Sequence, residues 1–336
     1  MRRTFAAAAV ALGLAALTSG DVARADTTPG PRSIGVRLLD APVDRKDDPR
    51  ALSYIVDHVA PGTTIQRHVE VSSTGPGFAE VSVYPAAAVV AGDGFVGQEG
   101  ATANELSSWT RLDRSTLTLR QGAHQSVAVT ISVPADAAPG ERYAVLWAQV
   151  GSPDGAAGIT EVSRVGIRIY LSVGGNNEPA SDFTIETLTA SRTADGRPLI
   201  TAQVHNTGGR ALDLGGTLSL SGGPAGLSAG PFTTQSATTL AVGAVGPVLV
   251  SLDPSLPPGP WTAAVTLRSG LLTRTAQASV TFPAAGTAQP APALAGSTPW
   301  TPIILSAAVL VAVALLLWFF LSRARATPGR HARRTS

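Results

Sequence analysis

Short segments in which apolar and polar residues alternate recur along this chain from residue 33 to residue 283. In Val127–Val133 every odd-numbered residue is valine or isoleucine, and threonine and serine lie between them. In Arg164–Leu171 the odd positions are again aliphatic, and two arginines and Tyr170 fall on the opposite face. A period of two is typical of β-strands with one buried face. The alternation therefore predicts an all-β fold in which Tyr170 faces outward.

The strands fall into two groups, which predict two domains over residues 33–175 and 180–283. The groups repeat one another weakly in their order of strands and Gly-containing turns. The matching pairs are Val69–Tyr84 with Ala202–Leu220, and Leu119–Trp147 with Leu240–Leu267. Short strands at this spacing favour two immunoglobulin-like β-sandwiches in tandem, with Greek-key crossings. Cysteine is absent, so each sandwich is expected to be held by its core without disulfides.

One segment, Tyr143–Val150, is apolar on both faces. Such a strand is expected at the centre of a sheet with both faces covered, which would place Trp147 in a core. The nearby segment Asn104–Trp109 lacks strand alternation, and we expect a short helical turn or a loop there.

The amino-terminal segment predicts a signal peptide over residues 1–25. Two arginines precede an apolar stretch, Phe5–Leu17, which is too short to span a bilayer. Small residues at Ala23 and Ala25 fit a cleavage site after Ala25. The run Arg2–Phe5 leaves twin-arginine export open as the alternative to an ordinary secretory signal.

Near the carboxyl end, Ile303–Leu321 is free of charge and predicts a transmembrane helix of about 28 Å. The tail, 322–336, carries five arginines and no acidic residue, which favours a cytoplasmic tail and an extracellular amino-terminal part. Residues 284–299 are rich in Ala, Pro and Gly and predict an extended stalk reaching about 50 Å. We therefore expect a single-pass plasma-membrane protein whose ectodomain lies in the cell wall.

The high isoelectric point, about 9.4, comes from the two ends of the chain. Once residues 1–25 and the tail are set aside, acidic residues outnumber basic ones. The charge of the ectodomain therefore gives no reason to expect nucleic-acid binding. No cofactor-binding motif is recognised.

Motifs for catalysis or metal binding are weak. The histidines of the expected ectodomain do not stand at metal-ligand spacing with another ligand type; they are His58, His68, His124 and His205. Gly226–Gly230 matches the nucleophile-elbow string GxSxG, but the strand–turn–helix context of that motif is missing. The charged run Asp44–Asp48 lacks EF-hand spacing and is expected to be a solvated loop. We predict no catalytic residue, no metal site and no enzyme.

Aromatic side chains are the candidates for contacts to a glycan, because sugars stack on flat rings. Tyr84 lies on a predicted strand, and Trp109 lies in a polar stretch with Arg111 close by. Tyr84, Trp109 and Arg111 are the candidate glycan contacts, but for Trp109 packing in a core or an interface is favoured over exposure.

The first domain resembles the peptidoglycan-binding domain of the WxL-interacting protein family over about residues 34–150. The resemblance is carried by Pro49–Tyr54, Ala60–Thr64, Val83–Ala87, Leu106–Trp109 and Val133–Glu141. It implies a wall-associated adhesion or scaffolding protein whose first domain binds peptidoglycan. The plan of signal peptide, two β-domains, membrane helix and basic tail also fits that family. The Arg-rich, Lys-poor composition suggests a high-GC actinobacterial source.

Two functions remain open from the sequence. The first is a non-catalytic, membrane-anchored binding protein that contacts peptidoglycan or another wall glycan. The second is a structural or accessory subunit that binds another surface or membrane protein. In both, the lipid bilayer is a partner through the helix between Ile303 and Leu321.

Overall fold

The protein is built mostly of β-strands, as the alternation predicts, and they form two sandwiches. The structure is a computed structural model that describes residues 33–151, 162–235, 238–283 and 288–295. No helix within these ranges is long and apolar enough to cross a membrane. The predicted signal peptide (1–25), transmembrane helix (303–321) and tail (322–336) lie outside the described residues.

The first sandwich faces a four-stranded sheet, in the order β1-β3-β8-β6, against a six-stranded sheet, in the order β2-β10-β9-β4-β5 with β7 on β4. The strands are β1 (Ile34–Leu38), β2 (Ile55–Val59), β3 (Thr64–Ser73), β4 (Phe78–Ala91), β5 (Gly94–Gly97), β6 (Thr110–Leu112), β7 (Thr116–Arg120), β8 (His124–Ser132), β9 (Gly140–Gly151) and β10 (Val162–Val173). The short helices are η1 (Val43–Arg45), α1 (Pro49–Ser53) and α2 (Glu105–Trp109). This order matches strands ABED facing GFC of immunoglobulin-like domains.

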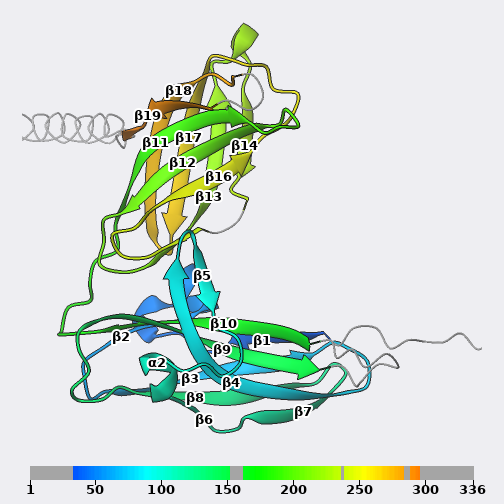
Figure 1. Ribbon diagram of the computed structural model, residues 1–336, viewed down its shortest axis with the longest axis vertical. Coiled ribbons are helices and arrows are strands. Elements are labelled where there is room, and N and C mark those ends of the chain that lie inside the picture. Colours follow the sequence, from blue (N-terminus) through cyan, green and yellow to red (C-terminus); the bar gives the residue numbers. More distant parts are fainter. Residues whose placement is uncertain (1–32, 152–161, 236–237, 284–287, 296–336) are drawn as a thin grey trace, which may run out of the picture.

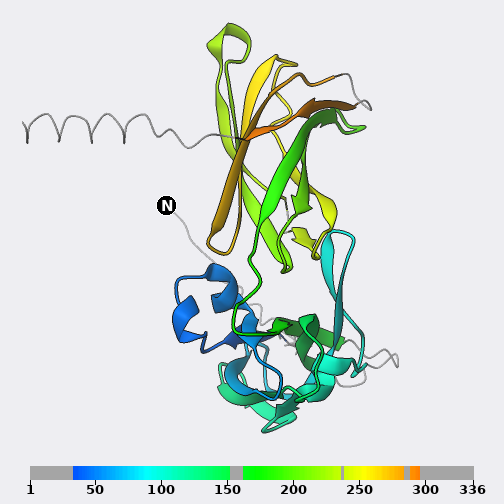
Figure 2. The same ribbon diagram turned by 90° about the vertical axis from the view of Figure 1, so that its left-hand side faces the viewer.

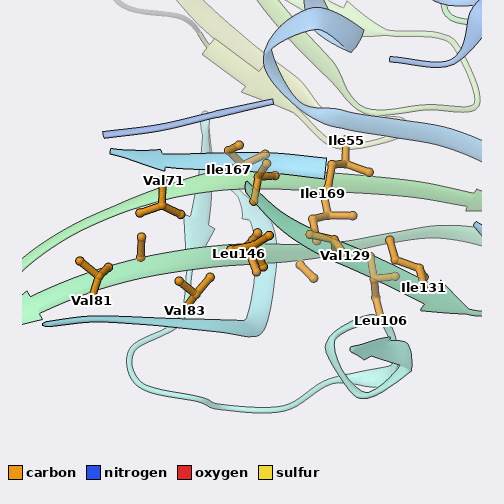
Figure 3. Close-up of a cluster of buried hydrophobic side chains, with 14 of the residues drawn as sticks. Ile55, Val71, Val81, Val83, Leu106, Val129, Ile131, Leu146, Ile167 and Ile169 are labelled. Atoms are coloured by element: carbon orange, nitrogen blue, oxygen red, sulfur yellow. The ribbon is translucent and has the colours of Figure 1, made fainter. Parts of the chain in front are cut away.

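The core of the first sandwich is aliphatic and lies between its two sheets (Figure 3). Val129 and Ile131 of β8 face Leu146 of β9 and Ile167 of β10, and each is at most 3% exposed. The alternation in β8 and β10 therefore positions the inward residues as the sequence predicts. Leu106 of α2 closes one end of this core, and α2 occupies the segment where a helical turn or loop is expected.

The second sandwich again faces a four-stranded sheet, β16-β12-β11-β19, against a six-stranded one, β14-β13-β17-β18-β20 with β15 on β13. The strands are β11 (Phe183–Arg192), β12 (Pro198–Asn206), β13 (Leu212–Ser221), β14 (Ala229–Thr233), β15 (Thr238–Leu240), β16 (Val245–Ser251), β17 (Trp261–Ser269), β18 (Leu272–Val280), β19 (Ala288–Pro292) and β20 (Leu294–Ala295), with the short helix η2 (Pro224–Gly226). It has a buried cluster of its own, which includes Leu188, Val204, Leu218, Val250 and Trp261.

The two sandwiches share one pairing scheme. In the first, β3 pairs with β8, β4 with β9, and β9 with β10. In the second, β12 pairs with β16, β13 with β17, and β17 with β18. The corresponding strands carry the repeated sequence segments, so the weak internal repeat reflects a repeated topology.

The strands of the second sandwich run along the long axis of the molecule, whereas those of the first run across it (Figure 1). The hairpin of β4 and β5 rises from the first sandwich to the near end of the second, as the view turned by 90° also shows (Figure 2). At its tip the Asp93 carbonyl accepts a hydrogen bond of 2.9 Å from the Thr239 amide of β15. The hairpin is therefore one of the contacts between the sandwiches.

Part of the predicted extended stalk, 284–299, pairs with strands of the second sandwich. β19 pairs antiparallel with β11, from Thr187 opposite Pro292 to Ser191 opposite Ala288. The Ala- and Pro-rich sequence favours extended backbone, and an edge strand tolerates proline because one side of it needs no hydrogen bonds. The sheets of the second sandwich thus extend to Ala295.

Candidate functional site

The two sandwiches meet around the carboxylate of Asp213, on β13 of the second sandwich. Arg50 Nε, from α1, donates to Asp213 Oδ2 at 2.6 Å. Arg168 Nη1 and the Tyr170 hydroxyl, both from β10, donate to Asp213 Oδ1 at 2.8 and 2.9 Å. Thr239 Oγ1 of β15 donates to the same oxygen at 2.8 Å. One largely buried carboxylate of the second sandwich is thus bound by three side chains of the first. We call Asp213 and its four partners, Arg50, Arg168, Tyr170 and Thr239, the joint between the sandwiches.

The short helix α1 positions Arg50 at this joint. Asp48 caps α1, its Oδ1 accepting from the Arg50 amide at 2.9 Å, and Pro49 occupies the first turn. Both are strong helix-starting signals. They place Arg50 on the covered side of the helix, where it is 8% exposed.

Burial and the charge of Asp213 act in opposite directions on Arg50 and in the same direction on Tyr170. Burial is the largest influence on the pKa of Arg50 and lowers it, but Asp213, Tyr170 and Glu141 together outweigh burial and the pKa is raised. Burial, reinforced by Asp213, raises the pKa of Tyr170 far above its usual range. Arg50 is therefore a cation and Tyr170 a neutral donor throughout the physiological pH range.

Four aromatic rings pack beside the ion pairs. Tyr170 lies 5.9 Å from Tyr54, 5.2 Å from Phe95 and 5.9 Å from Tyr143 between ring centroids. The Arg50 guanidinium lies 4.1 Å from the centroid of the Tyr170 ring. Tyr170 points outward from the core of its own sandwich, as the alternation predicts, but Ala51 of α1, Phe95 of β5 and Ala211 of the second sandwich pack around it and it is fully buried.

A second group of ion pairs surrounds the link between the sandwiches. Glu178 binds both Arg45 and Arg210. Glu141 Oε2 accepts from the Ala211 amide at 2.6 Å and from the Tyr143 hydroxyl at 2.7 Å. The charged run Asp44–Asp48 is therefore not simply a solvated loop, because Arg45 binds the linker and Asp48 caps α1.

A cleft of about 460 Å³ opens beside this joint. One wall comes from α1 and the residue after it, and the other from β13, β17 and the turn after β17. The lining residues are Pro49, Arg50, Ser53, Tyr54, Asp213, Gly215, Gly216, Thr217, Thr266, Arg268 and Gly270.

A separate aromatic surface lies on the outer face of the six-stranded sheet of the first sandwich. Trp147 of β9 stands directly opposite Tyr84 of β4. The Arg164 guanidinium lies 4.4 Å from the centroid of the indole, and the Tyr84 hydroxyl donates to Gln149 Oε1 at 2.7 Å. We call Tyr84, Trp147, Gln149 and Arg164 the Trp147 face.

The placement of Trp147 corrects a prediction. The strand β9 is central in its sheet, between β10 and β4, as expected, but Trp147 lies on its outer side and is half-buried, not in the core. Gly97 and Gly166 explain this, because a Cβ at either position would stand 2.6 Å from an indole carbon. The two glycines leave the space that the ring fills.

The three predicted glycan contacts do not come together. Tyr84 is on the Trp147 face. Trp109, at the end of α2, packs against the first core with the Arg142 guanidinium 5.0 Å from its ring centroid. Arg111 belongs to β6 in the opposite sheet, where it is exposed. Sequence reasoning missed the joint around Asp213, whose one sequence signal is the pair of tyrosines at outward positions of neighbouring strands, Tyr143 and Tyr170.

The structure also shows where the histidines and the GxSxG string lie. Within the described ranges no group of three or more His, Cys, Asp or Glu could hold a metal ion. His68 Nδ1 lies 2.8 Å from Asp40 Oδ2, which is an isolated pair. The segment Gly226–Gly230 runs from the last residue of η2 into β14, so the serine within it is followed by a strand and not by the helix of a nucleophile elbow.

No protein-family model and no curated protein matches this sequence. Solved structures with a similar arrangement include the class 5 fimbriae chaperone CfaA, at a TM-score of 0.34 and 12% identity, covering 72% of this chain and 98% of that one. The CupB2 chaperone of Pseudomonas aeruginosa aligns at 0.37 and 9%, covering 67% and 97%. The E. coli chaperone DraB aligns at 0.36 and 9%, covering 68% and 96%. Similarity at this level assigns neither a family nor a function.

Proposed function

We propose that this chain is a non-catalytic, membrane-anchored binding protein of the cell surface, whose ectodomain contacts peptidoglycan or another wall glycan. The observation that carries this proposal is the Trp147 face. It combines two aromatic rings with an arginine and an amide on one flat sheet surface.

The chemistry of this face suits a sugar polymer. The rings of Tyr84 and Trp147 offer flat apolar area, which matches the C–H faces of sugars. Gln149 and Arg164 add hydrogen-bonding groups beside the rings, and an arginine also suits the carboxylates of a wall polymer. The indole Nε1 already donates to the Gln98 carbonyl at 3.1 Å, which holds the ring in one orientation. A fixed ring loses little freedom when a ligand binds it.

Anchoring supports binding to a repeating polymer. Single contacts of this kind are weak, but a chain fixed in the membrane beside the wall meets many copies of the ligand at high effective concentration. The joint around Asp213 would hold the two sandwiches in one orientation while the Trp147 face is engaged.

The test is co-sedimentation of the purified ectodomain with isolated peptidoglycan. We expect Trp147→Ala and Arg164→Gln each to lower the bound fraction at least fivefold. Arg111→Gln is the matched control, because it removes an exposed arginine from the opposite sheet and should leave binding unchanged. Circular dichroism of each variant checks that the fold is kept.

Two results would count against the glycan role. One is no enrichment of the wild-type protein over an unrelated sandwich domain, and the other is an equal loss for Arg111→Gln. The accessory-subunit alternative predicts a different outcome: cross-linking in intact cells would capture one protein partner, and the purified protein would show no affinity for peptidoglycan.

A further inference from the structure

The cleft between the sandwiches contains two arginine side chains with unused hydrogen-bonding capacity, from Arg50 and Arg268. We infer that this cleft binds a carboxylate group of a small ligand between these two guanidinium groups. The site is separate from the Trp147 face, so this inference does not depend on whether that face binds a glycan.

Arg268 supplies the accessible charge. It lies on β17 opposite Gly215 of β13, and its side chain is exposed in the wall of the cleft. Its guanidinium makes no hydrogen bond or ion pair with any other described residue. This distinguishes Arg268 from Arg50 and Arg168, which both bind Asp213.

Arg50 supplies the buried donor. Its Nε binds Asp213, but its Nη2 is buried and has no hydrogen-bond partner within the described part of the chain. A buried donor without an acceptor is unfavourable, so such atoms are rare in folded proteins. An acceptor oxygen would satisfy it once the side chains that bury this atom move aside.

The walls leave room for such a group. Three of the lining residues, Gly215, Gly216 and Gly270, contribute no side chain of their own, and the Asp48 carboxylate lies beside Gly270. The hydroxyl-bearing residues Thr217 and Thr266 lie on the same wall as Arg268. The volume, about 460 Å³, falls within the range of about 300–1,000 Å³ that is usual for small-molecule sites.

The charge balance favours a carboxylate over a phosphate. Asp213 lies in the same cleft and binds both Arg50 and Arg168, and Arg268 is the one lining cation without an acidic partner among the described residues. A ligand with one negative charge matches this balance. A phosphate dianion would add a second charge close to Asp213, and like charges at short distance repel.

The probes are N-acetylalanine, its neutral amide and inorganic phosphate, titrated against the full chain in detergent micelles. Saturation-transfer NMR follows binding of the two organic probes. The binding of phosphate is measured by its competition with N-acetylalanine. We expect N-acetylalanine to bind, its amide to bind at least tenfold more weakly, and phosphate to compete poorly. Arg268→Gln should weaken binding of N-acetylalanine at least tenfold, and Arg120→Gln, an exposed arginine on β7 far from the cleft, should not.

Three outcomes would overturn the assignment: equal binding of acid and amide, phosphate competing as well as N-acetylalanine itself, or unchanged binding in Arg268→Gln. Arg268 is exposed and takes no part in the core, so its loss is not expected to unfold the protein. If Trp147→Ala loses binding to peptidoglycan, its binding of N-acetylalanine should be unchanged, so the two proposals can be tested separately.

Discussion

The hydroxyl of Tyr170 in the first sandwich donates a hydrogen bond of 2.9 Å to Asp213 Oδ1 in the second. Both side chains are largely shielded from water, and two arginines of the first sandwich bind the same carboxylate. A buried carboxylate with this many charged donors has one favourable position. The bond therefore fixes the orientation of one sandwich relative to the other.

Asp213→Asn should loosen this joint. The substitution keeps the shape but removes the charge that compensates the buried guanidinium of Arg50, and breaking a buried ion pair on one side costs about 3–5 kcal/mol. We expect the free energy of unfolding to fall by about that amount in urea titrations. Distances between spin labels placed one on each sandwich should also broaden.

Asp253→Asn is the control for Asp213→Asn. Asp253 is exposed, and among the described residues its carboxylate accepts only from Ser255, so the change should alter the unfolding free energy by less than about 0.5 kcal/mol. Equal stability of wild type and Asp213→Asn would show that the joint does not depend on this charge.

Gly166→Ala should disturb the Trp147 face. The new Cβ would lie 2.6 Å from an indole carbon and 2.8 Å from a methyl of Val145, and overpacking of this kind costs about 1–3 kcal/mol. Thermal denaturation measures the loss, and tryptophan fluorescence should report the displaced ring. The destabilisation caused by Gly166→Ala should be smaller in a Trp147→Ala background. Gly94→Ala is the control: nothing lies within 4 Å of the added Cβ, so its effect on stability should be nearly neutral.

Asn206→Ala should destabilise the second sandwich. The buried Asn206 Nδ2 donates to the carbonyls of Arg210, at 2.8 Å, and Ala241, at 2.9 Å. Each carbonyl left without a donor costs about 1–3 kcal/mol, so the loss should be visible as a lower urea midpoint. Gln203→Ala, on the same strand but half-exposed, serves as the comparison. Similar midpoints for the two variants would contradict the assigned role.

The pair Arg37–Glu70 gives a pH-dependent contribution. The two residues stand opposite each other on β1 and β3, and Arg37 Nε donates to Glu70 Oε1 at 2.7 Å. That hydrogen bond, opposed by some burial, holds the pKa of Glu70 below its ordinary 4.5. A carboxyl with a lowered folded-state pKa stabilises the fold above about pH 4.5, and the contribution is lost as the pH falls through the folded value.

NMR titration of the Glu70 carboxyl carbon measures this pKa. In Arg37→Gln it should return toward 4.5, whereas Arg120→Gln should leave it unchanged. A wild-type value at or above 4.5 would show that the pair does not form in solution.

Much of the architecture could be predicted from the sequence because the alternation is strict. The period alone identifies inward residues such as Val129, Ile131 and Ile167, since only one face of each of these strands meets its own core. The weak repeat also indicated that the two halves share a topology.

The joint could not be predicted in the same way. Alternation separates the two faces of a strand, but it does not distinguish a face covered by water from one covered by another domain. The period therefore predicts that Tyr170 faces outward, but not that it is buried. Nothing in the sequence indicates the contact between Arg50 and Asp213, because these residues meet only when both sandwiches are folded. Trp147 was misplaced for a related reason: the space for its ring comes from Gly97 and Gly166, which are distant from it in the sequence.

The pairing of β19 with β11 also bears on the order of events during synthesis. All strands of the first sandwich lie between Ile34 and Val173, so it has every partner it needs while the rest of the chain is still being made. The second sandwich must wait for Ala288–Pro292 before the edge of β11 is covered. Until then that edge offers unpaired backbone groups to any neighbouring strand, and newly made copies of this chain are most vulnerable to joining one another in that interval.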